Sequence, residues 1–303
     1  MTGVTLFRRL AVVTAIFAYL QIALGGVVRV SGSGLGCPDW PLCHGRPYPP
    51  ADVHSIIEYS HRAAGSVTGV LIIATVVLAW IVWRTRRPVV AWLATASLIG
   101  VVGEGLLGAG VVATELASWL VLVHLGLAMI ILGFLVAAVA MSMAPGPGVS
   151  DPRFRWLAAI AVGATYLLLL TGSTVVASGA DTACHSWPLC GSGFTFDFTG
   201  FNAFTMLHRG SVLVVGALLV FVLLRAARLP GLRAASIGTL TVFVLQVAVG
   251  AGAAVTDGEL FNGLHVALAT LVWAGVLTTA VLTLPRVDHD VQPSRMVAEK
   301  GSA

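Results

Sequence analysis

A carboxylate, an imidazole and a guanidinium fall within five residues at Glu58-Tyr59-Ser60-His61-Arg62, where a polar stretch gives way to a long apolar run. Ionisable side chains are costly at such a position in a membrane span, so they indicate a functional site. Glu58 precedes His61 by three residues, a spacing that places both side chains on one face of a helix. A carboxylate there could accept a proton or stabilise developing positive charge. The alternative is an exposed glutamate that pairs with Arg62.

Three further histidines lie, like His61, near the start of an apolar run: His124, His208 and His265. Each half of the chain holds two of the four, and helical bundles build cofactor sites from facing helices in this way. Imidazole is a common axial ligand of haem iron, whereas a zinc site would need third and fourth ligands that each pair lacks. The pattern favours two bis-histidine haem sites over a packing role.

An internal repeat divides the chain. Each histidine that follows a cysteine loop lies 18 residues after the second cysteine, Cys43 before His61 and Cys190 before His208. We therefore predict two related halves, residues 1–148 and 149–303. Thr205 stands in the second half where Glu58 stands in the first, so the carboxylate belongs to one half alone. The repeated loops are Cys37-Pro38-Asp39-Trp40-Pro41-Leu42-Cys43 and Cys184-His185-Ser186-Trp187-Pro188-Leu189-Cys190.

The four cysteines have two interpretations. Their spacing within each loop is not a typical zinc spacing, and the C-x-x-C-H signature of c-type haem attachment is absent from the sequence. A disulfide within each loop, Cys37 with Cys43 and Cys184 with Cys190, is the favoured interpretation. The other is a pair of free or redox-exchanging thiols, because exposed loop disulfides can be labile.

Composition predicts an all-α polytopic membrane protein. Of the 303 residues, 57% are apolar and 10% charged, against roughly 45–50% and about 25% in an ordinary globular domain, and the mean hydropathy is +0.94. The first apolar run exceeds the ~7–15 residues of a signal peptide core. We predict eight transmembrane helices in two four-helix bundles, over residues 10–28, 59–83, two helices within 89–141 divided at 114–118, 156–177, 205–224, 234–255 and 263–284.

The positive charges indicate the orientation. With both termini in the cytoplasm, all of the 17 Lys and Arg residues except Arg29, Arg46, Arg62 and Arg209 lie on the cytoplasmic side, as the positive-inside rule requires. Both cysteine loops then lie outside, where disulfides persist. The net positive charge of the chain reflects this topology and gives no reason to expect a nucleic-acid partner.

Several polar side chains inside or beside the spans have two interpretations each. Glu104, Gln21 and Gln246 each precede a glycine by four residues, which favours close helix packing with the polar group bonding across helices; a haem-adjacent role is the alternative. Arg29, Arg62 and Arg209 either pair with haem propionates or extend to the interface. The remaining histidines are expected to be solvated: His44, His54, His185 and His289.

Taken together, these motifs resemble the haem A synthase family of membrane enzymes, of the bacterial CtaA and Cox15 type. The resemblance covers nearly the whole chain except the polar C-terminal tail. It rests on Gly25-Gly26 with Arg29, on residues 31–37, on the two Trp-Pro-Leu-Cys loops, on residues 58–62 and on the later histidines.

The resemblance implies oxidation of a methyl group of haem O to a formyl group, which supplies haem A for the biogenesis of terminal cytochrome oxidases. It implies that His61 and His124 face the substrate haem, that His208 and His265 ligate a haem b, and that Glu58 is the catalytic carboxylate. The resemblance also implies that the protein lies in the lipid bilayer of the cell membrane. Its implied partners are an electron donor of unknown identity and haem O synthase (protohaem farnesyltransferase).

Two other classes of protein fit parts of the pattern. A dihaem b-type cytochrome that only relays electrons would also need four helix-borne histidines. A transporter built from parallel repeats would carry polar groups near helix breaks. The carboxylate confined to one half and the duplicated cysteine loops argue against both.

Overall fold

The computed structural model describes residues 3–143, 146–180, 183–190, 196–256 and 258–288. These residues form eight helices, each long and apolar enough to cross a membrane, which confirms the predicted all-α class and number of spans. The helices are α1 Gly3–Val30, α2 Val53–Trp83, α3 Pro88–Ala113, α4 Ser118–Met141, α5 Pro152–Ala177, α6 Asn202–Ala226, α7 Arg233–Thr256 and α8 Glu259–Leu282.

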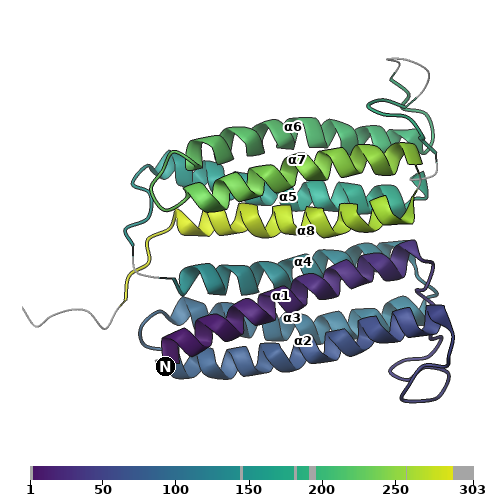
Figure 1. The fold of residues 1–303 in the computed structure, drawn as a ribbon, viewed down its shortest axis with the longest axis horizontal. Helices are drawn as coiled ribbons and strands as arrows, with labels where there is room; N and C mark the ends of the chain where they lie inside the picture. The colour runs from purple at the N-terminus through teal and green to yellow at the C-terminus, as the bar shows by residue number, and fades with distance from the viewer. Residues whose placement is uncertain (1–2, 144–145, 181–182, 191–195, 257, 289–303) are drawn as a thin grey trace, which may run out of the picture.

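The helices form two layers, α1–α4 in one and α5–α8 in the other (Figure 1). Within each layer, successive helices pack against each other, and the first packs against the fourth. The two long loops lie at one end of the molecule, and the start of α1 and the end of α8 lie at the other (Figure 1). Each layer is thus a four-helix bundle with its cysteine loop at the same end.

The structure corrects several helix starts. α2 begins at Val53 rather than Tyr59, because the Asp52 carboxylate caps the helix by accepting the Ser55 amide at 2.9 Å. Glu58 therefore lies within the helix rather than at its edge. α1 begins at Gly3 rather than at residue 10, and α6 and α8 also begin earlier than expected. Hydropathy underestimates these helices because their first turns carry polar residues.

The two bundles are joined along α1 and α4 of the first and α5 and α8 of the second. The Trp273 indole of α8 donates a buried hydrogen bond of 2.8 Å to the Met129 carbonyl of α4, and its ring packs on Tyr166 of α5. Gly26 of α1 lies so close to Val266 of α8 that a Cβ there would be 3.2 Å from the valine side chain. Small residues let helix backbones approach in membranes.

At the end opposite the cysteine loops, Arg87 ties the first bundle to the segment after α8. Its guanidinium is buried and pairs with Asp288 at 2.5 Å, while it donates to the carbonyls of Met141 and Met143. The polar C-terminal tail from residue 289, which carries Arg295 and Lys300, lies outside the described residues.

Candidate functional site

The four predicted histidines lie in two pairs. His61 of α2 and His124 of α4 are close enough to interact electrostatically, as are His208 of α6 and His265 of α8. Each pair comes from the second and fourth helices of one bundle, as the repeat predicts. All four side chains are partly buried. His61 lies further along its helix than expected, because α2 begins at Val53 rather than at residue 59.

A glycine on the preceding helix lies against each imidazole. A Cβ added at Gly25, Gly172 or Gly250 would come within 3.1, 3.0 or 2.7 Å of the histidine Cε1 atom, and one at Gly108 within 3.5 Å. The partners are His61, His208, His265 and His124, in that order. Any larger residue would press on three of the four rings, so these glycines fix where the imidazoles lie.

A polar side chain from the same preceding helix approaches Nδ1 of each imidazole. The Gln21 amide lies 3.1 Å from His61 Nδ1, and the Gln246 amide lies 3.0 Å from His265 Nδ1. Thr171 Oγ1 is 2.9 Å from His208 Nδ1. Glu104 Oε1 is 3.1 Å from His124 Nδ1. The sequence predicted that Gln21, Glu104 and Gln246 bond across helices but did not predict these partners. It missed Thr171, whose one signal is its position directly before Gly172.

This arrangement fits haem ligation through Nε2. The side-chain oxygens Gln21 Oε1, Gln246 Oε1 and Glu104 Oε2 are buried without a partner among the described residues. A half-turn of the Gln246 amide would place its oxygen beside Nδ1, since amide oxygen and nitrogen are exchangeable in such assignments. The Gln21 amide nitrogen also donates to the His61 carbonyl at 3.0 Å, which fixes that amide in its present orientation. An imidazole that donates Nδ1–H to an acceptor keeps Nε2 free for a metal, as ligating histidines usually do.

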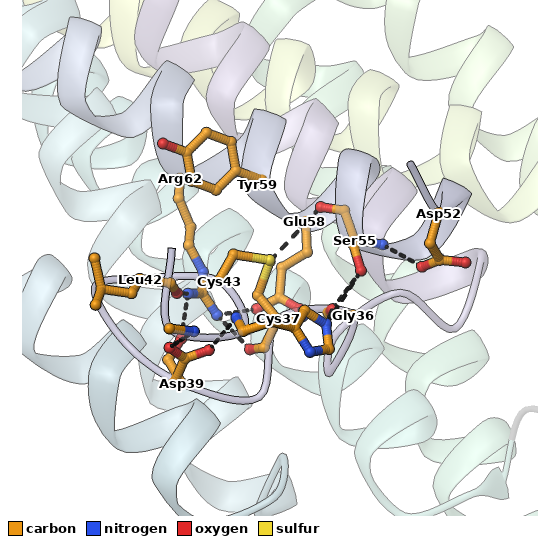
Figure 2. The surroundings of a disulfide bond; sticks show 12 residues. Gly36, Cys37, Asp39, Leu42, Cys43, Asp52, Ser55, Glu58, Tyr59 and Arg62 are labelled. Carbon is orange, nitrogen blue, oxygen red and sulfur yellow. Dashed lines mark hydrogen bonds and ion pairs between the residues drawn. A yellow bond between two sulfur atoms is a disulfide. The ribbon is translucent and has the colours of Figure 1, made fainter. Parts of the chain in front are cut away.

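Glu58 and Arg62 hold the first cysteine loop (Figure 2). Glu58 is 3% exposed; its Oε1 pairs with Arg62, and its Oε2 accepts the Cys37 amide at 2.8 Å. Arg62 also donates to the carbonyls of Cys37, Asp39 and Leu42. The pairing of Glu58 with Arg62 that the alternative interpretation contained is therefore present, but the glutamate is buried rather than exposed. Arg62 binds the loop, which neither of its two predicted roles included.

The first loop is further fixed by Asp39. Its carboxylate accepts the His44 amide at 2.6 Å and the Gly45 amide at 2.8 Å. These backbone donors, Gly45 first, lower the pKa of the Asp39 carboxyl below its ordinary value. The predicted disulfide between Cys37 and Cys43 is present, and both cysteines are buried.

Among the residues that the structure describes, the second loop is held by different contacts. Its disulfide joins Cys184 and Cys190, as predicted. Thr205, which stands where Glu58 does, donates to the Ala180 carbonyl at 3.2 Å. Arg209 reaches the Pro188 carbonyl at 3.2 Å and the Cys190 sulfur at 3.8 Å. The two halves therefore use equivalent positions differently, and the charged pair belongs to the first.

The remaining predicted polar residues are at the surface. Arg29 reaches from the end of α1 to the Val176 carbonyl of α5 at 3.5 Å. His44 and His54 are exposed, as expected, although each is hydrogen-bonded, and His185 is exposed as well. His289 lies outside the described residues.

Comparison with known proteins gives a consistent family. The family model COX15-CtaA, described as cytochrome oxidase assembly protein, matches residues 8–56 and 51–277. Relatives named Heme A synthase include one from Alkalihalophilus pseudofirmus, 31% identical over 71% of this chain and 73% of its own length. Others are from Shouchella clausii, 28% identical over 70% and 73%, and Geobacillus thermodenitrificans, 27% identical over 89% of both chains.

Proposed function

Because the chain belongs to the COX15-CtaA family of cytochrome oxidase assembly proteins, we propose that it is a haem A synthase. It is a multi-pass membrane oxidoreductase that converts a methyl group of haem O to the formyl group of haem A. The observation that carries the proposal is the pair of imidazole sites, one in each bundle, each ring held by a glycine and approached by a polar side chain at Nδ1.

The two bundles take different haems in this proposal. The first, residues 1–148, binds the substrate haem O between His61 and His124, and the second, residues 149–303, binds haem b between His208 and His265. The difference in polar groups supports the division, since the first bundle has Glu58 and Glu104 where the second has Thr205 and Gln246. When bound, haem b supplies one-electron transfer to the neighbouring site.

The residues of the first bundle have separate tasks. Gly25 limits where the His61 ring can lie, Gly108 is in ordinary contact with the His124 ring, and Gln21 and Glu104 approach the two Nδ1 atoms. Glu58 is the proposed catalytic carboxylate. Its carboxylate pairs with Arg62 beneath the loop, where a negative charge can stabilise positive charge that develops during oxidation of the methyl group.

The membrane setting suits the substrate. An isoprenoid-bearing haem can enter a helical site directly from the bilayer. We place the protein in the cell membrane with both termini in the cytoplasm, in accordance with the distribution of Lys and Arg. Haem O synthase is a proposed partner because it makes the substrate, and a separate redox partner must exchange electrons with the protein during the oxidation.

The decisive experiment is expression of the full chain with a haem O source, followed by chromatography of the extracted haems. We expect haem A to appear with the wild-type chain and to be absent when His61 is replaced by Ala. A purified protein that binds haem in both bundles but forms no haem A would instead be an electron-relaying dihaem cytochrome. A protein without haem absorbance would overturn both assignments.

Glu58→Gln tests the role of the carboxylate. The amide keeps an oxygen that can accept the Cys37 amide but removes the negative charge, so we expect both haems to bind and haem A formation to fail. Asp39→Asn is the control, because it weakens the first loop without changing Glu58. Normal haem A levels with Glu58→Gln would remove Glu58 from the mechanism. An equal loss with Asp39→Asn would reduce its role to holding the loop.

A further inference from the structure

Three of the four imidazoles are approached at Nδ1 by a neutral side chain, and His124 is approached by a carboxyl group. Glu104 of α3 and Gln246 of α7 occupy equivalent positions, each four residues before the glycine that lies against the histidine of the next helix, Gly108 or Gly250. At these equivalent positions the first site has an acid where the second has an amide, at 3.1 and 3.0 Å from Nδ1. The other two Nδ1 partners, Gln21 at His61 and Thr171 at His208, are both neutral.

The Glu104 contact is built into the helix packing. Its side chain is 16% exposed, and Oε1 lies 3.1 Å from His124 Nδ1. The contact does not have hydrogen-bond geometry, and both His124 Nδ1 and Glu104 Oε2 are buried without a hydrogen-bond partner in the described part of the chain. The carboxyl torsion has a broad minimum, so a small rotation would align an oxygen with the Nδ1–H bond.

On the basis of the proposed function, we propose that Glu104 is a positioning residue for the substrate haem. Its carboxylate accepts the Nδ1 proton of His124, fixes Nε2 toward the iron and makes this imidazole a stronger electron donor than its counterpart His265. A carboxylate partner raises the basicity of a ligating imidazole more than an amide does, because the acceptor carries a full charge. A stronger axial donor stabilises the oxidised iron of the substrate haem.

In the second bundle, the neutral amide of Gln246 leaves His265 a weaker electron donor to its haem iron than His124 is. A neutral acceptor orients His265 without adding negative charge, so haem b keeps the higher reduction potential of the two. The asymmetry thus distinguishes a haem that is to be oxidised from one that transfers electrons, within two otherwise similar histidine pairs.

The test uses the full-length protein in detergent with both haems bound, and reciprocal substitutions. Glu104→Gln gives the first site the partner that the second has, and Gln246→Glu does the reverse. We measure the reduction potential of each haem by optical titration and its low-spin spectrum by electron paramagnetic resonance. A variant that lacks His208 identifies the signals that belong to the second site.

We expect Glu104→Gln to raise the potential of the first haem, to change its resonance spectrum and to weaken its binding by about 10-fold, the lower end of typical outer-shell effects. The second haem should not change. Gln246→Glu should lower the potential of the second haem and leave the first unchanged. Haem content of the unsubstituted site reports that each variant is folded.

Unchanged potentials and spectra in Glu104→Gln with both haems bound would overturn the inference, as would equal shifts in both haems. Should Glu104→Gln not fold, an unchanged potential in Gln246→Glu decides against the inference in the same way. Failure of the proposed function has a different signature, because a wild-type chain that binds no haem at His61 and His124 removes the site itself.

Discussion

Each of the four imidazoles is held between a glycine and a polar side chain, and the contacts repeat with small variations around two similar sites. His265 has the tightest of the four glycine contacts, with Gly250. At the scale of single residues, the location of each ring thus depends both on the missing side chain of a glycine and on a polar side chain, both from the preceding helix.

Gly250→Ala should therefore reduce haem binding in the second bundle. The new Cβ would lie 2.7 Å from His265 Cε1, closer than real Cβ contacts, so the ring must move. Gly238→Ala on the same helix is the matched control, because a Cβ there meets nothing within 4 Å. We expect haem content at the second site to fall several-fold in the first variant only. Equal haem content in both variants would contradict the role of Gly250.

Asp39 gives the first loop a dependence on pH. The pKa of the Asp39 carboxyl is lower in the folded loop than its ordinary value of 3.8. The ionised carboxylate therefore stabilises the folded loop fully above pH 3.8, and this stabilisation is lost as the pH falls through the folded pKa. Amide exchange at His44 and Gly45, corrected for intrinsic rates, should accelerate on acidification. Asp39→Asn should show faster exchange already at neutral pH. Identical protection in the variant would argue against this carboxylate as the anchor.

At the scale of elements, the two cysteine loops have the same motif and different attachments. Arg62 binds three carbonyls of the first loop as well as Glu58, whereas Arg209 makes one carbonyl contact and one sulfur contact with the described residues of the second. Arginine's planar fork allows such multiple bonding, which lysine cannot reproduce.

Arg62→Lys should loosen the first loop more than Arg209→Lys loosens the second. We expect the Cys37–Cys43 disulfide, buried in the wild type, to be reduced and alkylated at least several-fold faster in Arg62→Lys. Mass spectrometry after timed exposure to a mild reductant would measure both loops in one sample. A larger acceleration at Cys184–Cys190 in Arg209→Lys would reverse the expected order.

The sequence predicted these elements well and their starts poorly. Apolar runs located all eight spans, and the repeat located both loops, because each signal extends over many residues. The start of α2 was missed since Asp52 caps a polar turn that hydropathy assigns to a loop. The same error left Arg62 at a membrane edge, whereas the helix carries its guanidinium beneath the loop carbonyls. Such contacts depend on loop conformation, which no spacing encodes.

At the scale of the whole molecule, two four-helix bundles pack along α1, α4, α5 and α8. The four histidines were predictable because the repeat gives them equivalent positions. The contacts of Glu104 and Thr171 were not, since a polar residue inside a span can face a neighbouring helix in several ways, and only the packed bundle selects one.

Trp273→Phe should weaken the joint between the bundles. It removes the buried donor to the Met129 carbonyl, at a cost of about 1 kcal/mol for a hydrogen bond of this kind, while an aromatic ring remains to pack on Tyr166. Trp119→Phe is the control, because Trp119 is 64% exposed. Thermal unfolding in detergent should show a lower midpoint for Trp273→Phe only. Equal midpoints would mean that the indole adds nothing to the joint.

The adjacent glycines of α1 serve different bundles. Gly25 lies against His61, and Gly26 lies against Val266, the residue that follows His265. One turn of α1 therefore contacts a histidine of the first site and the residue next to a histidine of the second. Neither half can be transplanted, redesigned or expressed alone with its site intact, because a first half on its own would leave Gly26 facing lipid, and a second half would lack the surface that backs Val266.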